Sequence, residues 1–98
     1  MKKVVFRLKR VWEGRDLWAE ILRGRKTVEY RNNTDYWRSR LLEGKSPRIA
    51  WFTVGYPKNN VPRLEAVITE IHIKLDLIHT HFRDVVLISD IIPPLSSV

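Results

Sequence analysis

The segment Arg63–Leu75 constrains the fold most, because it alternates like a strand and then changes phase. Its apolar residues form two sets of alternate positions that lie one residue out of step: Leu64, Ala66 and Ile68, then Ile71, Ile73 and Leu75. An alternation of period two slips in this way where a β-bulge inserts one extra residue, and a bulge bends its strand. The pattern therefore predicts a long, bent strand that curves a sheet.

Two short helices are predicted from the residues at their ends. Asp16 is a suitable N-cap for a helix over residues 15–23, and Gly24 can adopt the left-handed conformation that ends it. The polar turn Asn32–Asp35 precedes a second helix, which ends by Gly44.

The other strands are predicted from alternation and from β-branched or aromatic residues, at 3–10, 26–31, 49–54 and 84–92. Residues 49–54 are apolar on both faces, which indicates a central strand, and residues 55–62 form a loop. The last three strands leave no room for crossover helices, so a doubly wound parallel sheet is not expected. We expect an α+β fold, a small mixed or antiparallel β-barrel with two or so short helices.

The composition limits the class of protein. With 98 residues the chain forms one domain, which we assign to residues 1–92, and residues 93–98 are expected to be a frayed tail. Because the chain has no cysteine, disulfides, thiolate metal sites and a cysteine nucleophile are excluded, and a reducing compartment is favoured. The first strand is too charged for a signal peptide, and no apolar run reaches the roughly 18 residues of a membrane span. We expect a cytoplasmic protein with no membrane partner.

The charge is distributed unevenly along the chain. The formal net charge is +7, and residues 1–49 hold 14 Lys and Arg against 6 Asp and Glu. Residues 50–98 hold 4 cations against 5 carboxylates, so the first half carries all of the excess. A one-sided basic field attracts polyanions, nucleic acids above all, and the alternative is a basic surface that only keeps the protein in solution.

One short motif combines a glycine with three charged residues: Gly24, Lys26, Glu29 and Arg31. The glycine follows the predicted helix and lets the chain turn sharply into the next strand. The Glu29 carboxylate can hold Lys26 or Arg31 in place, and the two cations suit a phosphate or a base edge. Lys26 and Glu29 lie on opposite faces of a regular strand, so we expect Lys26 in the turn, before pairing begins. The alternative is an ordinary half-exposed strand.

This motif resembles the signature of the ASCH family, Gly-x-Lys-x-x-Glu-x-Arg after a helix that ends in Ile/Leu-Leu, and Ala50–Tyr56 resembles the following barrel strand and its exit loop in such proteins. The resemblance implies a PUA-like fold and a cleft, lined by the motif residues, that binds RNA or a nucleotide. Some ASCH proteins cleave RNA, and another branch deacetylates a modified cytidine. That branch is expected to carry a hydroxyl residue where this chain has Glu29.

Aromatic residues near the cations are candidates for base stacking. We select Tyr30, beside the motif, and Tyr56, in a Gly-Tyr-Pro loop with Lys58, whereas Trp18 and Trp51 are expected to belong to the core. The predicted ligand-binding residues are therefore Gly24, Lys26, Glu29, Tyr30, Arg31, Tyr56 and Lys58. Lys26 and Glu29 are also the candidate catalytic residues, because burial would bring their proton affinities together.

His79 and His81 have the spacing of residues on one strand face. A zinc site needs a third or fourth donor, and the sequence offers only His72 and scattered carboxylates. We therefore expect solvated histidines, no metal and no cofactor. If the pair faced the cleft, it could also act as acid and base in RNA cleavage.

Three functions follow from these observations. The first is an RNA- or nucleotide-binding domain that uses the basic motif. The second is an enzyme on the same scaffold, either a metal-independent ribonuclease or, less favoured, an amidohydrolase acting on a modified nucleoside. The third is a protein-interaction domain whose basic face meets an acidic partner.

Overall fold

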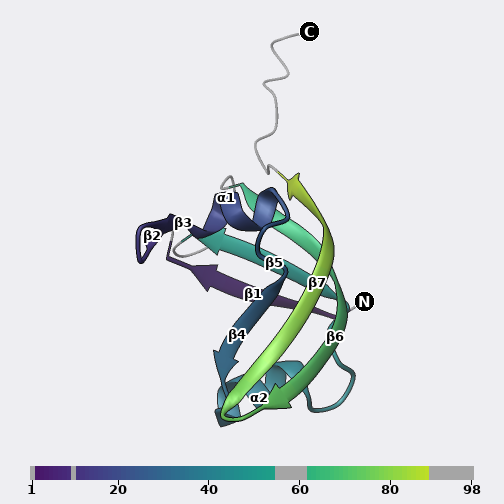
Figure 1. Ribbon diagram of the computed structural model, residues 1–98. Helices are drawn as coiled ribbons and strands as arrows, with labels where there is room; N and C mark the ends of the chain where they lie inside the picture. Colours follow the sequence, from purple (N-terminus) through teal and green to yellow (C-terminus); the bar gives the residue numbers. More distant parts are fainter. Residues whose placement is uncertain (1, 10, 55–61, 89–98) are drawn as a thin grey trace, which may run out of the picture.

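The structure, a computed structural model, describes residues 2–9, 11–54 and 62–88. It contains seven strands and two helices within these ranges (Figure 1): β1 (Lys3–Leu8), β2 (Val11–Trp12), β3 (Arg15–Asp16), α1 (Leu17–Leu22), β4 (Val28–Asn32), α2 (Asp35–Leu41), β5 (Ile49–Val54), β6 (Arg63–Lys74) and β7 (Leu77–Ile88). Five of the strands form one sheet, and β2 and β3 form a separate hairpin.

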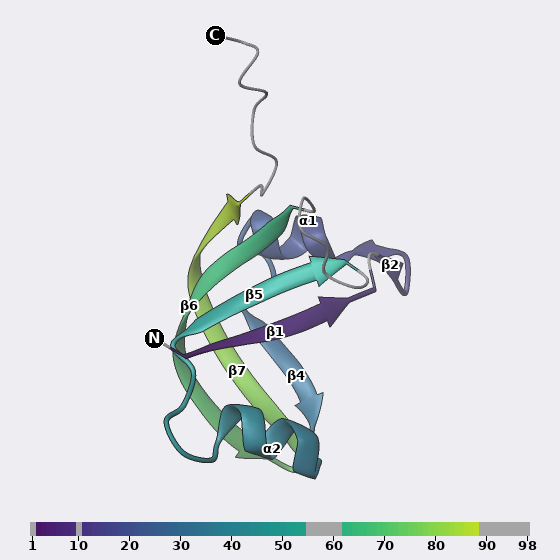
Figure 2. The same ribbon diagram turned by 180° about the vertical axis from the view of Figure 1, so that it is seen from behind.

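The main sheet has the strand order β1-β5-β6-β7-β4. β1 runs parallel to β5, and the other neighbouring strands are antiparallel, so the sheet is mixed. It curls into a half-barrel with α1 at one end and α2 at the other (Figure 1, Figure 2). The expected α+β fold with a curved mixed sheet and two short helices is confirmed, but the sheet remains open between its edge strands β1 and β4.

The predicted bend in β6 is confirmed by its pairing with β7. The register between the two strands shifts between Glu65 and Val67 and again between Ile68 and Glu70. Leu64, Ala66 and Ile68 are buried, and their alternation ends where the second shift begins. The irregular pairing bends β6 so that one sheet can reach around the core.

The last strand begins earlier than predicted, at Leu77 rather than at residue 84. It follows β6 directly through the turn at Leu75 and Asp76, where Leu75 has a positive φ of 58°. The sequence did not predict this start, because His79 and His81 alternate with Ile78 and Thr80. Only the face of the strand that carries Ile78 and Thr80 is buried. The predicted continuation to residue 92 lies partly outside the described residues.

A small hairpin was missed between β1 and α1. Residues Glu13 and Gly14 both have positive φ, 50° and 76°, and connect β2 to β3. The predicted helix over 15–23 is therefore shorter, since Asp16 closes the hairpin and then caps α1, accepting a hydrogen bond from the Ala19 amide at 3.1 Å. The predicted Asp16 cap and left-handed Gly24, with φ of 76°, are both confirmed.

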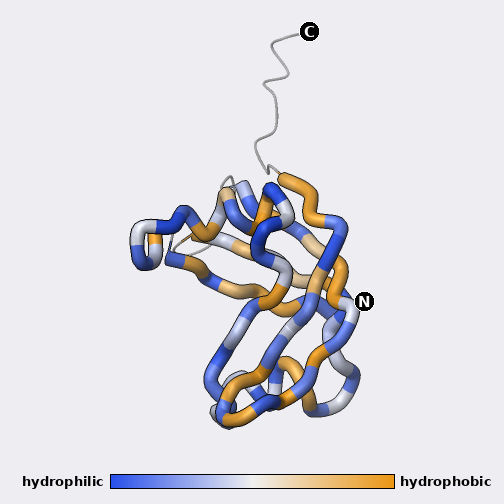
Figure 3. Tube along the Cα trace, in the orientation of Figure 1, coloured by the Kyte–Doolittle hydropathy of each residue, from blue (hydrophilic) through white to orange (hydrophobic). Residues whose placement is uncertain are grey.

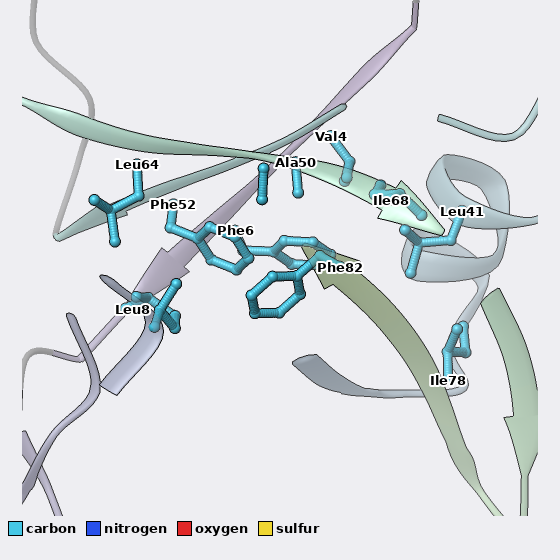
Figure 4. Close-up of a cluster of buried hydrophobic side chains, with 12 residues drawn as sticks. Val4, Phe6, Leu8, Leu41, Ala50, Phe52, Leu64, Ile68, Ile78 and Phe82 are labelled. Atoms are coloured by element: carbon cyan, nitrogen blue, oxygen red, sulfur yellow. The ribbon is translucent and has the colours of Figure 1, made fainter. Parts of the chain in front are cut away.

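The core lies inside the curled sheet. Its buried side chains come from the inner face of the strands and from both helices (Figure 4): Val4, Phe6, Leu8, Ile21, Leu41, Ala50, Phe52, Leu64, Ala66, Ile68, Ile78 and Phe82. Apolar and polar residues alternate along most strands, as Figure 3 shows, and central β5 has a consecutive buried pair, Phe52 and Thr53.

The two tryptophans expected in the core differ. Trp18 packs against the core cluster from α1, as predicted. Trp51 alternates with the buried Ala50 and Phe52 on β5, and it is only partly buried. Its ring lies beneath Lys3, whose Nζ is 3.5 Å from the ring centroid, and its indole nitrogen donates to Glu65 at 2.9 Å. Trp51 therefore belongs to a polar cluster on the outer face, because the strand's period of two turns it away from the core.

Replacing Thr34 by alanine should lower the free energy of unfolding by about 1 kcal/mol, the usual cost of losing an N-cap. The Thr34 hydroxyl accepts a hydrogen bond from the Trp37 amide at 3.3 Å and caps α2. Urea denaturation measures the change. Thr34→Ser keeps the acceptor and should retain most of the stability, so an equal loss in both variants would show that the hydroxyl is not responsible.

Candidate functional site

An open cleft of about 990 Å³ lies where the sheet does not close. Its walls are the end of β1, the β2–β3 hairpin, the turn before β4, β4 itself and the start of α2. β1 and β4 are the two edges of the sheet, so the cleft occupies the seam between residues that are far apart in the sequence. The motif predicted from the sequence forms one side of this seam.

Glu29 is the centre of the motif. Its residue is 5% exposed, and its two carboxylate oxygens contact different cations. Oε1 is 3.3 Å from Lys26 Nζ, and Oε2 accepts a hydrogen bond from Arg31 Nη2 at 2.8 Å. A carboxylate buried this deeply needs such partners, since an unpaired buried charge is costly. Glu29 therefore holds both cations in place, whereas the sequence left open which of them it would hold.

Lys26 lies in the turn before β4, as predicted. Strand pairing with β7 begins only at Val28, so the chain at Lys26 is not bound by strand geometry and can bring the ammonium to Glu29. The same Nζ donates to the Val28 carbonyl at 2.6 Å and lies 5.3 Å from the centre of the Tyr30 ring. These contacts fix the lysine at the rim of the cleft, with 16% of its side chain exposed.

Arg31 bridges the open seam. Its Nη2 donates to the Arg7 carbonyl on β1 at 3.0 Å, in addition to the bond with Glu29. The guanidinium carbon lies 5.0 Å from the Trp37 ring centre and 5.3 Å from that of Phe6. One side chain thus connects both sheet edges and the core, and it also lines the cleft.

The cleft is strongly basic. The described residues that line it include six cations, namely Arg7, Lys9, Arg15, Arg25, Lys26 and Arg31, and one carboxylate, that of Glu29. Glu20 accepts hydrogen bonds from Arg25 at 2.7 Å and Arg15 at 2.9 Å. These two bonds, that from Arg25 first, lower the pKa of Glu20, so its carboxylate stays charged and holds both arginines at neutral pH.

Exposed aromatic rings accompany these cations. Trp12 is 50% exposed, and Tyr30 and Tyr36 are each 49% exposed. All three line the cleft, and each has a cation over its ring: Lys9 over Trp12, Lys26 over Tyr30 and Arg40 over Tyr36. Exposed flat rings beside cations are a recurring feature of surfaces that stack nucleobases.

The predicted site residues are placed as follows. The structure brings Lys26, Glu29, Tyr30 and Arg31 together in one cleft, and Gly24 forms the turn that leads into it. Tyr56 and Lys58 lie outside the described residues. Sequence reasoning did not select six other cations and exposed aromatic residues that line the cleft: Arg7, Lys9, Trp12, Arg15, Arg25 and Tyr36. The sequence did contain a signal for this part of the site. Cations stand on both sides of Trp12, and the Glu-Gly pair that follows it is typical of a turn.

The three histidines also come together, on β6 and β7. His72 Nε2 lies 3.0 Å from His81 Nε2, and the His79 ring centre is 5.9 Å from that of His72. Partial burial, together with the nearby His72, Lys74 and His81, lowers the pKa of His79. The predicted pair therefore has His72 as a close third member, because β6 and β7 form a tight hairpin.

Comparison with known proteins identifies no relative from which a function could be inferred. No family model matches the chain, and no curated protein or solved structure matches it significantly. Among the described residues, no helix has both the length and the apolar character needed to cross a membrane.

Proposed function

We propose that this protein is an RNA- or nucleotide-binding domain of the ASCH type, with a PUA-like fold, that acts in the cytoplasm and binds its ligand in the seam between β1 and β4. The observation that carries the proposal is the combination of six cations, one carboxylate and three exposed aromatic rings in one cleft. In this proposal the phosphates of the ligand pair with the cations, and its nucleobases stack on the aromatic rings. The cleft volume, about 990 Å³, is at the upper end of the usual range for small-molecule sites and also admits part of a longer strand.

The residues of the cleft have different roles in this proposal, according to their chemistry. Arg15 and Arg25, held by Glu20, offer guanidinium groups to phosphates on one wall. Trp12 and Tyr36 present half-exposed rings for stacking on opposite sides of the seam. Glu29 positions Lys26 and Arg31 and contributes no ligand contact of its own in this proposal.

Lys26→Ala should weaken binding of a short single-stranded RNA by about tenfold, the effect of losing one charge-assisted contact. Fluorescence anisotropy with labelled RNA at moderate, fixed salt measures the change. The matched control is Lys45→Ala, which removes the same group from an exposed position outside the cleft. The control should change binding by less than about twofold, because it alters only the overall charge.

Two outcomes would contradict the proposal. Equal weakening by Lys26→Ala and Lys45→Ala would show a non-specific attraction to positive charge. Binding of polyglutamate as tight as that of RNA at matched salt, with no effect of Trp12→Ala, would favour a protein-interaction domain, because an acidic peptide has no bases to stack.

A ribonuclease on the same scaffold is the second candidate. Lys26 Nζ and Glu29 Oε1 are 3.3 Å apart in a largely buried position, which is the geometry of a proton-transfer pair. The integrity of the RNA is therefore read on a gel from the same titration, with and without chelator. Cleavage that persists in chelator and is lost in Lys26→Ala would make the protein a metal-independent ribonuclease. Release of a free acid from an acylated nucleoside, without RNA cleavage, would indicate the amidohydrolase.

A further inference from the structure

All three histidines of the chain lie on one face of the β6–β7 hairpin. His72 is paired with His79 across the hairpin, and Glu70 is paired with His81. Ile78 and Thr80 are buried on the inner face, so the alternation of β7 turns His79 and His81 to the outer face. The tight turn at Leu75 and Asp76 sets this register, and the hairpin therefore presents the three rings together.

The spacing of the ring nitrogens suits a metal ion. One nitrogen from each ring can be chosen so that all three lie within 4.8 Å of one another, and the Nε2 atoms of His72 and His81 are 3.0 Å apart. A tetrahedral zinc ion with Zn–N bonds of about 2.0–2.1 Å holds its nitrogens roughly 3.3 Å apart. The three nitrogens are therefore close to this spacing already.

We propose that His72, His79 and His81 bind a divalent transition metal ion, with Zn²⁺ as the best-suited ion. Imidazole nitrogen is a preferred ligand of zinc, and three protein ligands leave a fourth position for water or another ligand. None of the three histidines lines the cleft, so this site is separate from the proposed RNA-binding residues, although Tyr30, which lines the cleft, packs against His79.

Two neighbours support the site. The Glu70 carboxylate lies 3.9 Å from His72 Nδ1, while the Nε2 atom of the same ring faces His81. The contact is longer than a hydrogen bond, but it places the carboxylate on the side from which it could orient a histidine that binds metal through its other nitrogen. On the opposite side, the Tyr30 ring packs edge-on against His79, with ring centres 4.7 Å apart, and limits the rotation of His79.

The test is a titration of tag-free, metal-stripped protein with Zn²⁺ by isothermal calorimetry, and with Co²⁺ by visible absorption. The chain has only these three histidines and no cysteine, so tag-free protein carries no other imidazole or thiolate ligand. We expect one Zn²⁺ per chain, the intense visible bands of tetrahedral Co²⁺, and a higher melting temperature with Zn²⁺. Glu70→Gln should weaken binding about tenfold, and His81→Gln should weaken it more.

Asp84→Asn is the matched control, because it removes an exposed carboxylate from β7 away from the histidines and should leave Zn²⁺ affinity unchanged. His72→Gln provides a second ligand variant at a half-exposed position, so that a folding defect in His81→Gln does not decide the matter. The proposal is overturned if the unmodified chain takes up no Zn²⁺ saturably, or if folded His72→Gln binds it as tightly. RNA binding measured in chelator tests the cleft separately.

Discussion

Glu29→Gln is expected to lower the free energy of unfolding by about 3 kcal/mol, the usual effect of removing one partner from a buried ion pair. The Glu29 side chain is 7% exposed, and it holds Lys26, at 16%, and Arg31, at 23%. Glutamine has the same shape but no charge, so two largely buried cations would remain with no counter-charge between them. Guanidinium denaturation followed by tryptophan fluorescence measures the loss.

The control for this prediction is Glu43→Gln, the same chemical change at an exposed residue after α2. It should alter stability by less than about 0.5 kcal/mol. A double variant that combines Glu29→Gln with Lys26→Met then tests the ion pair. Its loss of unfolding free energy should be smaller than the sum of the losses in the two single variants. Equal stability of Glu29→Gln and Glu43→Gln would mean that the carboxylate does not hold the motif together.

Phe6→Ala is expected to lower the free energy of unfolding by about 4 kcal/mol, a large part of the roughly 5–15 kcal/mol by which a typical domain is stable. Phe6 is fully buried, and its ring stacks on Phe52, with centres 5.6 Å apart, and on Trp37, with centres 5.4 Å apart. The guanidinium of Arg31 lies over the same ring. Alanine would leave a cavity beneath the residue that bridges the seam, so stability and the shape of the cleft would change together.

Two further variants define the cause of that loss. Phe6→Leu fills part of the cavity and should cost less than Phe6→Ala. Tyr36→Ala removes an aromatic ring that is 49% exposed and should cost less than about 1 kcal/mol. A Phe6→Ala protein as stable as Tyr36→Ala would show that the Phe6 ring is not part of a packed core. Thermal and urea denaturation give the comparison.

The local elements of the fold follow directly from the sequence. The Asp16 cap, the left-handed Gly24 and the shift of phase in β6 each depend on residues close to one another in the chain, so propensity and periodicity could predict them. The position of Lys26 before β4 followed from the same reasoning, because a regular strand would have separated it from Glu29. Two of the errors, the β2–β3 hairpin and the start of β7, arose where strands are very short or apolar on one face only.

The sequence by itself determined a basic first half, the helix–turn–strand motif and a bent sheet, since these depend on composition and on neighbouring residues. Only the tertiary structure decided that β1 and β4 face each other across an open seam, which Arg31 bridges to the Arg7 carbonyl. It also decided that His72 meets His79 and His81, because that contact depends on the register of a hairpin. Alternation tells which face of a strand is buried, but it does not tell which strands become neighbours, and both sites are built from such neighbours.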